Sequence, residues 1–476
     1  MPEPLAIAFH GAARTVTGSR HLLRFGRHRW LFDCGLYQGH RDEADRVNRT
    51  FHFDPGELET VVVSHAHLDH TGNLPTLVAQ GFDGAIHATA ATADLCRVML
   101  ADSAFLLERD HEKVNRRARR QGRPLREPLY RPADVEVTLE KLATHAYHEE
   151  FEPVPGVRAR YHDAGHILGS ALTTFDLESG GRRFRLGMSG DLGRPHRPIL
   201  RDPEVHPGVD ALVLESTYGD RLHPPERETR ARLLEVMRRT LERGGRVLVP
   251  SFAVGRTQEL VATLHGLIED GDVPDVPMFV DSPLARLATG VFRQHPECFD
   301  AETVRSFERT NARDGGWGAP FGFPRLRYVS SPEESRALNE RRDPCVIIAA
   351  SGMCEGGRIL HHLQHGLGDP RNTVLFVGYQ AGGTLGRRLK DGAEEVNIWG
   401  EPVRRRAEIA ALDGFSAHAD QGELVGWVSR LDPAPRRIFL VHGDLEPAET
   451  LAAKLRESVA AEVVVPEPAQ EFDLWN

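Results

Sequence analysis

The chain has 476 residues, 59 Lys and Arg against 69 Asp and Glu, a formal net charge of −10, and 40% hydrophobic residues. This composition is typical of a globular protein with two or three domains, or one large domain with an insertion. The negative net charge excludes binding to nucleic acid through bulk positive charge, so any polyanion site must be a local basic surface.

The cysteines and the apolar segments limit the cellular setting. The five cysteines form no CxxC pair and no even disulfide framework, which favours a reducing, cytoplasmic location. The first residues lack a basic region followed by a long apolar core, so we expect no signal peptide. No run approaches the roughly 18 apolar residues that a membrane span needs, so we expect no membrane partner.

Short apolar segments that end in polar loops fill the first part of the chain. They predict strands at 4–11, 29–35, 59–67, 85–89, 157–161, 171–177, 183–188 and 211–215. The pattern between 93 and 107 is helical. Residues 109–131 then hold nine Arg or Lys against three Asp or Glu, a local charge of nine minus three, or +6. Such a run is usually a solvated face, but a binding surface stays open because it is the one strongly basic island of the chain.

From about residue 220 strands and helices alternate, in units at 246–269, 277–294, 345–364 and 373–390. This alternation predicts a mostly parallel sheet with ligand-binding loops at the carboxyl ends of its strands. Residues 306–324 interrupt the units as a predicted loop, and strands with long loops resume after about 400. We therefore predict a β-rich domain formed by residues 1–216 and 399–476, with an α/β domain at 217–398 inserted into it.

The strongest chemical signal is Ser64-His65-Ala66-His67-Leu68-Asp69-His70, directly after an apolar strand. His65 and His67 are two residues apart, project the same way and can hold one metal ion, whereas Asp69 and His70 turn toward a second. Neutral imidazoles and a carboxylate are the ligands of Zn²⁺ in catalytic sites that leave one position open for water. A purely structural cluster with this spacing would be unusual.

This HxHxDH pattern resembles the metallo-β-lactamase superfamily of metallohydrolases. Three further residues match its other motifs, each at or after a predicted strand: Asp33 in WLFD, His166 in DAGHILGS and Asp191 in MSGDLGR. The resemblance implies an αββα sandwich.

Later segments narrow the resemblance to the β-CASP nucleases, which process RNA. Glu215 in LVLESTYGD, His418 in FSAHAD and His442 in LVHGD are similar to motifs A, B and C of that family. The segments SFAVGRTQEL, DSPLA, SGMCEGGR and GYQAGGTLGRRL are also similar to β-CASP sequences. The resemblance covers essentially the whole chain. It is closest to the compact bacterial form, and the chain is similar to the cleavage and polyadenylation endonuclease subunit.

The resemblance implies two zinc ions per chain. One would be held by His65, His67 and His166, the other by Asp69, His70 and His442, with Asp191 bridging both. Two cations so close need an anionic ligand between them. The residues that it implies in catalysis are Asp69, His418, Glu215 and Asp33. Among these, His418 would be the general acid, because histidine titrates near pH 7, with Glu215 fixing its orientation.

Loops of the inserted domain are candidates for binding phosphate groups. Backbone amides at helix starts, together with hydroxyl side chains, form phosphate sites, although plain turn residues explain these loops equally well. The candidates are Ser251, Arg256, Ser351, Gly352, Gly382, Gly383 and Thr384. None of these loops is a P-loop, which disfavours nucleotide hydrolysis. Phe252, Tyr218 and Tyr379 are candidates for stacking on bases or for core packing.

The resulting hypothesis is a zinc-dependent ribonuclease that hydrolyses single-stranded RNA, endonucleolytically or also from the 5′ end, with the basic stretch near the rim of the RNA-binding cleft. A DNA-directed nuclease stays open, because the motifs say little about the 2′-hydroxyl. A small-molecule thioester or lactone hydrolase is disfavoured by the inserted domain. A non-catalytic RNA-binding subunit is disfavoured by the complete ligand set. A homodimer is left open.

Overall fold

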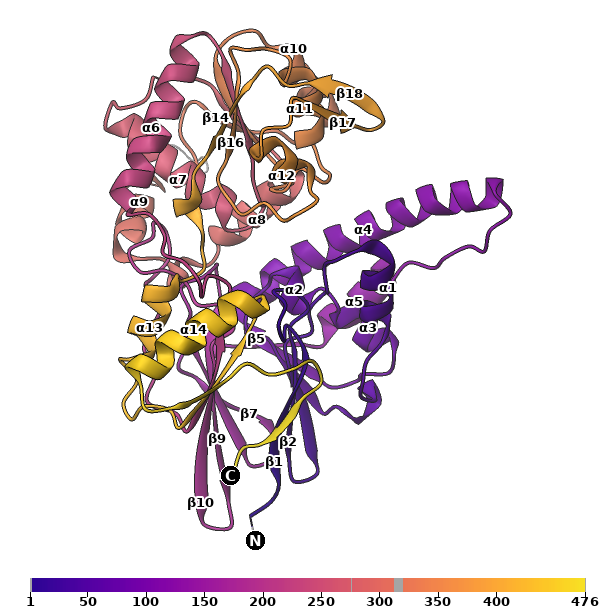
Figure 1. Ribbon diagram of the computed structural model, residues 1–476, viewed down its shortest axis with the longest axis vertical. Coiled ribbons are helices and arrows are strands. Elements are labelled where there is room, and N and C mark those ends of the chain that lie inside the picture. The colour runs from indigo at the N-terminus through magenta and orange to yellow at the C-terminus, as the bar shows by residue number, and fades with distance from the viewer. Residues whose placement is uncertain (1, 275, 312–319, 476) are drawn as a thin grey trace. The chain divides into compact units, whose positions relative to one another are not determined.

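The computed structural model of the protein describes residues 2–274, 276–311 and 320–475, with only the backbone for residues 41 and 307–311. It divides into two compact units (Figure 1). Unit 1 comprises Met1–Pro195, Asp202–Leu222 and His418–Asn476, and unit 2 comprises His196–Arg201 and His223–Ala417. The sequence placed its domain boundaries at other residues, after 216 and 398, and those boundaries stay a prediction.

The first sheet of unit 1 has seven strands in the order β22-β1-β2-β3-β4-β5-β6. Their bounds are β1 (Leu5–Gly11), β2 (Arg20–Phe25), β3 (His28–Phe32), β4 (Thr60–Val62), β5 (Ala85–Thr89), β6 (Leu142–His145) and β22 (Glu471–Asp473). The pairs β1–β2 and β2–β3 are antiparallel, whereas β3, β4, β5 and β6 run parallel. The carboxyl ends of β3 and β4 therefore lie at the same edge.

The second sheet of unit 1 has seven strands in the order β21-β20-β11-β10-β9-β8-β7. Their bounds are β7 (Glu150–Val154), β8 (Val157–Asp163), β9 (Ala171–Ser179), β10 (Arg182–Met188), β11 (Ala211–Glu215), β20 (Arg437–Val441) and β21 (Glu462–Val464). β10, β11 and β20 are parallel, and β9 is antiparallel to both β8 and β10. Hence β8, β10, β11 and β20 all end at one edge.

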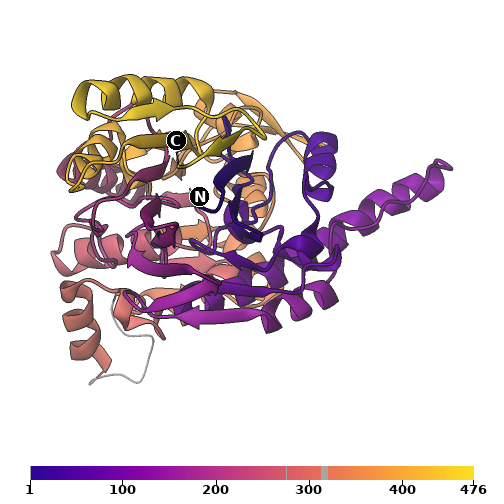
Figure 2. The same cartoon turned by 90° about the horizontal axis from the view of Figure 1, so that it is seen from below.

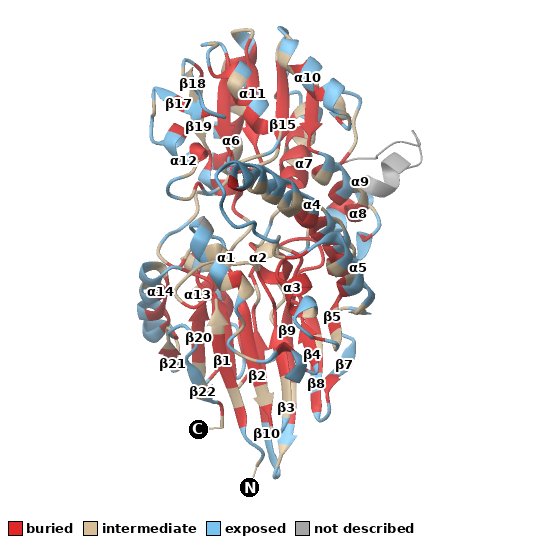
Figure 3. Cartoon of the chain, turned by 90° about the vertical axis from the view of Figure 1, so that its right-hand side faces the viewer, coloured by how far each residue is buried: buried red, intermediate tan, exposed pale blue. Residues whose placement is uncertain are grey.

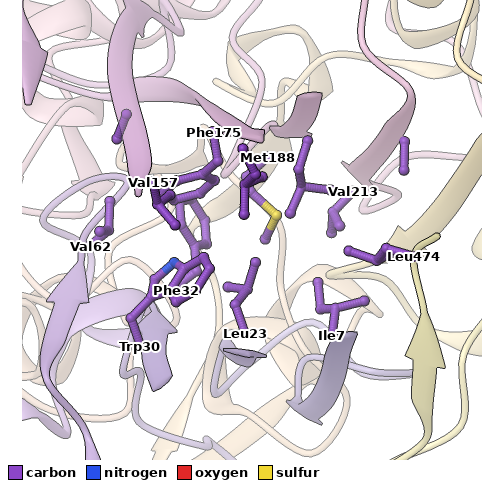
Figure 4. Close-up of a cluster of buried hydrophobic side chains, with 14 of the residues drawn as sticks. Ile7, Leu23, Trp30, Phe32, Val62, Val157, Phe175, Met188, Val213 and Leu474 are labelled. Atoms are coloured by element: carbon purple, nitrogen blue, oxygen red, sulfur yellow. The ribbon is translucent and has the colours of Figure 1, made fainter. Parts of the chain in front are cut away.

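Side chains that alternate along the strands fill the space between the two sheets (Figure 4). Trp30 and Phe32 of β3 pack there with Phe175 of β9, Met188 of β10 and Val213 of β11. Burying each such side chain contributes about 1.5–3 kcal/mol. This core fixes the position of the two sheets relative to each other, and with it the position of the edges where their strands end.

Helices cover the outer faces of both sheets. Leu77 of α3 (Leu74–Ala79) packs with Val61 of the first sheet. The helix α5 (Pro132–Glu140) lies against α3, and α4 (Ala90–Arg120) contacts β5 and β6 of the same sheet. Trp427 of α13 (Gln421–Val428) and Leu451 of α14 (Leu445–Ser458) pack with Leu440 of the second sheet. The order helix, sheet, sheet, helix confirms the predicted αββα sandwich. The remaining helical segments of unit 1 are α1 (Arg41–Arg49), η1 (Pro55–Glu57) and α2 (Leu68–Thr71).

The helix α4 (Ala90–Arg120) is longer than the sequence pattern indicated, because it continues through the first part of the basic stretch. Thr89 begins it by accepting a hydrogen bond from the amide of Thr92, and Gly122 follows its end with φ of 63°. Glu, Arg, Lys and Ala dominate its second half and form helix readily. That half extends away from the rest of unit 1 (Figures 1 and 2). All nine basic residues between 109 and 131 are exposed, and Figure 3 draws this half of α4 largely in the colour of exposed residues.

Unit 2 contains a six-stranded sheet in the order β14-β13-β15-β12-β16-β19, in which every pair is parallel. Its strands are β12 (Arg246–Pro250), β13 (Met278–Asp281), β14 (Leu326–Tyr328), β15 (Cys345–Ala349), β16 (Thr373–Phe376) and β19 (Glu408–Ala411). The helices predicted for the four strand–helix pairs are α7 (Arg256–Glu269), α8 (Pro283–Phe292), α11 (Ile359–Gly366) and α12 (Leu385–Lys390). The predicted inserted α/β domain is thus confirmed.

The remaining elements of unit 2 are α6 (Glu226–Glu242), α9 (Ala301–Asn311), α10 (Pro332–Glu340), η2 (Pro296–Cys298), η3 (Asp413–Phe415), and the antiparallel pair β17 (Glu395–Ile398) and β18 (Glu401–Arg404). Of the predicted loop at 306–324, residues 306–311 are helical and 312–319 lie outside the described residues. Among the described helices, none combines the length and the apolar composition that crossing a bilayer requires.

Candidate metal centre

Loops at the carboxyl ends of six strands of unit 1 carry the candidate residues. Asp33 follows β3, the segment Ser64–His70 follows β4, and His166, Asp191 and His442 follow β8, β10 and β20. Glu215 is the last residue of β11. Because these strands end at corresponding edges of the two packed sheets, residues far apart in the sequence meet at one place.

The first group of side chains comprises His65, His67, His166 and Asp191. Nε2 of His65 lies 3.0 Å from Nδ1 of His67, which lies 3.3 Å from Nε2 of His166. Oδ2 of Asp191 is 3.4 Å from Nε2 of His65 and 3.5 Å from Nε2 of His166. These four atoms are spaced like ligands around one ion, because tetrahedral zinc with bonds of about 2.0–2.1 Å separates its ligand atoms by roughly 3.3 Å.

The second group comprises Asp69, His70 and His442, and it also faces Asp191. Nε2 of His70 and Nε2 of His442 are 3.0 Å apart, and Oδ2 of Asp69 lies 3.5 Å from Nε2 of His442. The other oxygen of Asp191, Oδ1, is 3.2 Å from His70 and 3.6 Å from His442. Each oxygen of Asp191 thus faces a different group, which is the geometry that the bridging role requires.

The donor set fits metal ions. Oδ1 of Asp191 is buried and accepts no well-formed hydrogen bond from the described residues, a costly state for a carboxylate unless a cation offsets it. Burial lowers the pKa of His67 to about 4 and lowers those of His65 and His166 as well, so these rings are neutral at pH 7 and can bind metal. Burial would raise the pKa of Asp191, but the surrounding imidazoles outweigh it and hold that pKa well below its usual range.

Hydrogen bonds to the far ring nitrogens fix the orientation of the imidazoles. Oδ2 of Asp33 lies 2.7 Å from Nδ1 of His70, and the hydroxyl of Ser64 donates to Asp33 while it accepts from Nδ1 of His65 at 3.0 Å. Both contacts turn Nε2 toward the centre. Such outer partners orient metal ligands and raise their basicity.

Thr217 is a residue of this kind that the sequence did not single out. Its hydroxyl donates to the carbonyl of His442 at 2.9 Å and accepts from Nδ1 of the same ring at 3.1 Å. It follows β11, the parallel neighbour of β20, so only the pairing of these strands brings it to His442. Its one sequence signal is its position two residues after Glu215.

His418 lies beside the metal candidates. Its Nδ1 is 3.1 Å from both oxygens of Glu215 and 3.8 Å from Oδ2 of Asp191, and its ring centre is 4.5 Å from that of His166. Glu215 is fully buried and also accepts from the amide of Leu192 at 2.8 Å. Burial would lower the pKa of His418, but the carboxylates of Glu215 and Asp191 outweigh it and raise that pKa to about 9.

The candidates for substrate binding lie in unit 2, in loops after β12, β15 and β16. These strands are neighbours in the sheet, so the structure brings the loops together. The ring of Phe252 lies against Gly352, where an added Cβ would come within 2.9 Å of it, and a Cβ on Gly382 or Gly383 would meet nothing within 4 Å. The aromatic candidates Phe252 and Tyr379 are 45% and 50% exposed.

Local contacts occupy several of these candidate side chains. Arg256 pairs with Glu259 at 2.7 Å, the buried Ser251 accepts from Thr257 at 3.1 Å, and the hydroxyl of Thr384 begins α12. These contacts support a structural role for the three side chains. The backbone at Gly382 and Gly383 stays open to a ligand, because an added Cβ there would meet nothing within 4 Å.

Comparisons with known proteins agree with this architecture. Residues 21–168 match the metallo-β-lactamase superfamily, residues 257–389 the β-CASP domain, and residues 402–466 the Zn-dependent metallo-hydrolase RNA specificity domain. A ribonuclease of Thermus thermophilus is 40% identical over 436 residues, which cover 92% of this chain and 92% of the relative. The transcription termination factor FttA of Methanosarcina mazei is 32% identical over 466 residues, covering 95% of this chain and 69% of the relative.

A solved structure from Enterococcus faecalis, described as a protein of unknown function, aligns with 99% of this chain and 100% of its own at a TM-score of 0.51 and 13% identity. That likeness concerns the fold alone. The sandwich, the inserted domain and the cluster of histidines agree with the matched family models and with the 40% identity to the Thermus relative. The chain belongs to the β-CASP family of metallo-β-lactamase-type, metal-dependent hydrolases, as the motifs indicated.

We expect Thr217→Val to weaken metal binding about 10- to 100-fold, the usual effect of removing an outer partner of a ligand. Valine keeps the shape of threonine but removes the acceptor that holds Nδ1 of His442. Competition with a chelator, followed by metal analysis, measures the affinity. Thr217→Ser is the matched control, because it keeps the hydroxyl. Equal metal affinity in the valine and serine variants would contradict the assigned role.

Proposed function

We propose that the protein is a zinc-dependent ribonuclease that hydrolyses phosphodiester bonds of single-stranded RNA, chiefly at internal positions. The observation that carries the proposal is the division of the two oxygens of Asp191 between two groups of imidazoles. A two-ion site is typical of phosphodiester hydrolysis. The match to an RNA specificity domain and the ribonuclease name of the Thermus relative support RNA as the substrate.

The proposed ligands follow the two groups: one zinc ion at His65, His67 and His166, the other at Asp69, His70 and His442, with Asp191 shared. When bound, two such ions stabilise charge on phosphate oxygens and make water a better nucleophile near neutral pH. The residues of the chain supply the rest. Asp33 and Thr217 hold His70 and His442, and the exposed edge of Asp69, whose side chain is 20% exposed, lies toward solvent.

His418 is the proposed general acid. Its Nδ1 lies at hydrogen-bond distance from Glu215, which fixes the ring, so the proton that the ring can transfer is the one on Nε2. The departing 3′-oxygen of RNA is a poor leaving group and needs a proton as the bond to phosphorus breaks. Glu215 is a positioning residue in this scheme, because its buried carboxylate is held by His418 and by the amide of Leu192.

The remaining substrate contacts are proposed for the loops of unit 2 that contain Ser251, Arg256, Ser351, Gly352, Gly382, Gly383 and Thr384. Their common position at the carboxyl ends of neighbouring parallel strands supports a ligand-binding role. The exposed rings of Phe252 and Tyr379 suit stacking on unpaired bases. All five cysteines are buried thiols, which supports a reducing compartment such as the cytoplasm.

A direct assay tests the activity. Zinc-loaded protein is incubated with RNA and DNA of equal sequence, labelled at the 5′ end or internally. We expect RNA to be cut at internal positions, and release of single nucleotides from the 5′ end would add an exonuclease mode. Cleavage of DNA alone, or of a thioester or lactone without cleavage of RNA, would overturn the proposal. Light scattering of the same preparation measures whether the chain forms a homodimer.

We expect Asp191→Asn to lose metal from both groups together, because among the described side chains it is the one that faces both of them. Metal analysis of protein purified without chelator should give about two zinc ions more per native chain than per chain of this variant. His166→Asn is the matched control, since His166 belongs to one group only. Loss of a single ion from the Asp191 variant would contradict a bridging role.

We expect His418→Ala to retain its metal and cleave RNA about 10²–10⁴-fold more slowly, the usual effect of losing a positioned acid. Glu215→Gln should show a milder defect, because an amide can still contact the ring. A substrate with sulfur in place of the leaving 3′-oxygen needs little protonation and should recover much of the rate in His418→Ala. Loss of zinc from that variant, or no recovery with sulfur, would show that the assignment is wrong.

We expect replacement of Arg116, Arg117, Arg119 and Arg120 by alanine to weaken RNA binding and to flatten its salt dependence. These four exposed side chains form no ion pair with a described residue. Each phosphate contact of a single strand contributes about 0.7 to the slope of log K against log salt, so the slope should fall by up to roughly 3.

The control replaces Arg27, Arg158, Arg182 and Arg183, four exposed arginines at the opposite ends of the strands β3, β8 and β10. The net charge changes equally in both variants. If the slope of log K against log salt falls equally in both variants, the effect of the α4 arginines is one of net charge alone. If the slope does not change in the α4 variant, the basic stretch is a solvated face that does not contact RNA.

A further inference from the structure

A second cluster of side chains of the types that bind metal ions lies in unit 1, separate from the centre described above. It consists of His148 in the turn between β6 and β7, His162 on β8, and Glu204 in the connection between β10 and β11. One ligand atom of each side chain lies within 4.8 Å of the others. No side chain is shared with the Asp191 centre.

The spacing within this cluster differs from that of ordinary histidine–carboxylate hydrogen bonds. Nε2 of His148 lies 3.3 Å from Oε1 of Glu204, and Nδ1 of His162 lies 3.8 Å from Oε2. Direct N–H···O hydrogen bonds usually span about 2.7–3.2 Å, as in the pair of His362 with Asp281 at 2.7 Å. A shared cation with bonds of about 2.0–2.2 Å instead separates its ligand atoms by roughly 3.3 Å, and the atoms facing Asp191 show the same spacing, 3.2–3.6 Å.

The backbone and neighbouring side chains hold all three residues in place. Glu204 donates its amide to the carbonyl of Asp163 at 2.9 Å, and its carbonyl accepts from the indole of Trp427 at 2.8 Å. Nε2 of His162 contacts the hydroxyl of Thr174 at 3.2 Å, so Nδ1 is the atom that faces Glu204. The amide of His148 donates to the carbonyl of Tyr161 at 2.9 Å.

Exposure leaves a route to this cluster. The side chain of His162 is 7% exposed, whereas those of Glu204 and His148 are 30% and 57% exposed. Two protein nitrogens and one carboxylate form the base of the site, and solvent reaches its open side. This donor set and this exposure suit a transition metal that keeps one water ligand.

We propose that His148, His162 and Glu204 form an additional binding site for a divalent transition metal, with Zn²⁺ as the preferred ion. The site is structural. Glu204 comes shortly after residues 196–201, the segment that groups with unit 2, at the point where the chain has returned to unit 1. A bound ion ties this returning segment to β8 and to the turn before β7. It therefore stabilises the connection between β10 and β11, which precedes Glu215.

The variant that tests the site is His148→Asn. His148 has φ of 66°, a left-handed conformation that asparagine tolerates better than most residues, so the exchange removes the imidazole with little backbone strain. His40→Asn is the matched control, an exposed histidine outside the clusters found among the described residues. Both variants are also placed in the Asp191→Asn background, which separates this site from the catalytic centre.

Metal content is measured after equilibration of the chelator-treated chain with zinc chloride. We expect the native chain and His40→Asn to bind about one ion more than His148→Asn. In the Asp191→Asn background we expect about one ion to remain and to be lost when His148→Asn is added. Equal zinc content with and without His148→Asn, across a graded series of chelator concentrations, would overturn the proposal. The result does not depend on whether the chain cleaves RNA.

Limited proteolysis gives a second reading of the same site. We expect zinc chloride to slow cleavage within the connection between β10 and β11 at least several-fold in the Asp191→Asn chain, and to have no such effect once His148→Asn is added. Glu204→Gln, which keeps the shape of the side chain and removes its charge, should behave like His148→Asn. Equal protection of all three chains would show that the connection is not held by an ion at this cluster.

Discussion

The buried carboxylate of Asp191 is the constraint on which the arrangement of the centre depends. Its two oxygens face opposite groups of imidazoles at 3.2–3.6 Å. Both groups of imidazoles therefore contact the same side chain. A carboxylate in this position cannot be satisfied by solvent, and burial alone would favour its neutral form. The surrounding imidazole nitrogens keep this carboxylate ionised instead. Asp33, Ser64 and Thr217 orient imidazoles around it, so their positions also depend on Asp191.

The loops that carry the residues of the centre pack closely against one another, backbone against backbone. A Cβ on Gly35 would lie 1.6 Å from the carbonyl oxygen of Asp69, and one on Gly193 would lie 2.0 Å from that of Gly165. The glycines let the loop after β3 contact the Asp69 loop, and the loop after β10 contact the His166 loop. Asp33 and His442 have φ of 59° and 51°, a left-handed conformation that is uncommon outside glycine, although Asp and His adopt it more often than most residues, and that clusters at functional sites.

Much of the centre could be predicted from the sequence because its ligands come in local patterns. His65, His67, Asp69 and His70 lie within six consecutive positions. Asp33, His166, Asp191 and Glu215 lie at or shortly after apolar segments that predicted strands. Thr217 could not be found in this way, since its contact with His442 depends on the parallel pairing of β11 with β20. Local patterns also missed the length of α4, in whose second half Ala118 is the one buried residue, so that this half has little hydrophobic period.

Long-range pairing likewise decides features that no local motif carries. β19 joins the six-stranded sheet by pairing with β16, although the sequence after residue 400 has the strand-and-loop character of the β-rich domain. His148, His162 and Glu204 are spread over 57 positions without a shared motif, and only the antiparallel pairing of β7 with β8 and the course of the later connection bring them together. Motifs identify ligands that lie within one loop, whereas a site assembled from a turn, a strand and a later connection is visible only in the fold.

The charge of the centre explains how an acidic chain can take a polyanion as substrate. Asp33, Asp69, Asp191 and Glu215 concentrate four carboxylates around the imidazoles, and the chain as a whole carries −10. Without cations this surface would repel phosphate, since like charges a few ångströms apart interact strongly in a buried site. The two divalent cations of the proposed centre would carry four positive charges and offset the four carboxylates. In the proposed function, metal loading would therefore be a condition for RNA to approach the centre as well as for its cleavage, and the exposed basic residues of α4 would supply a longer-range attraction.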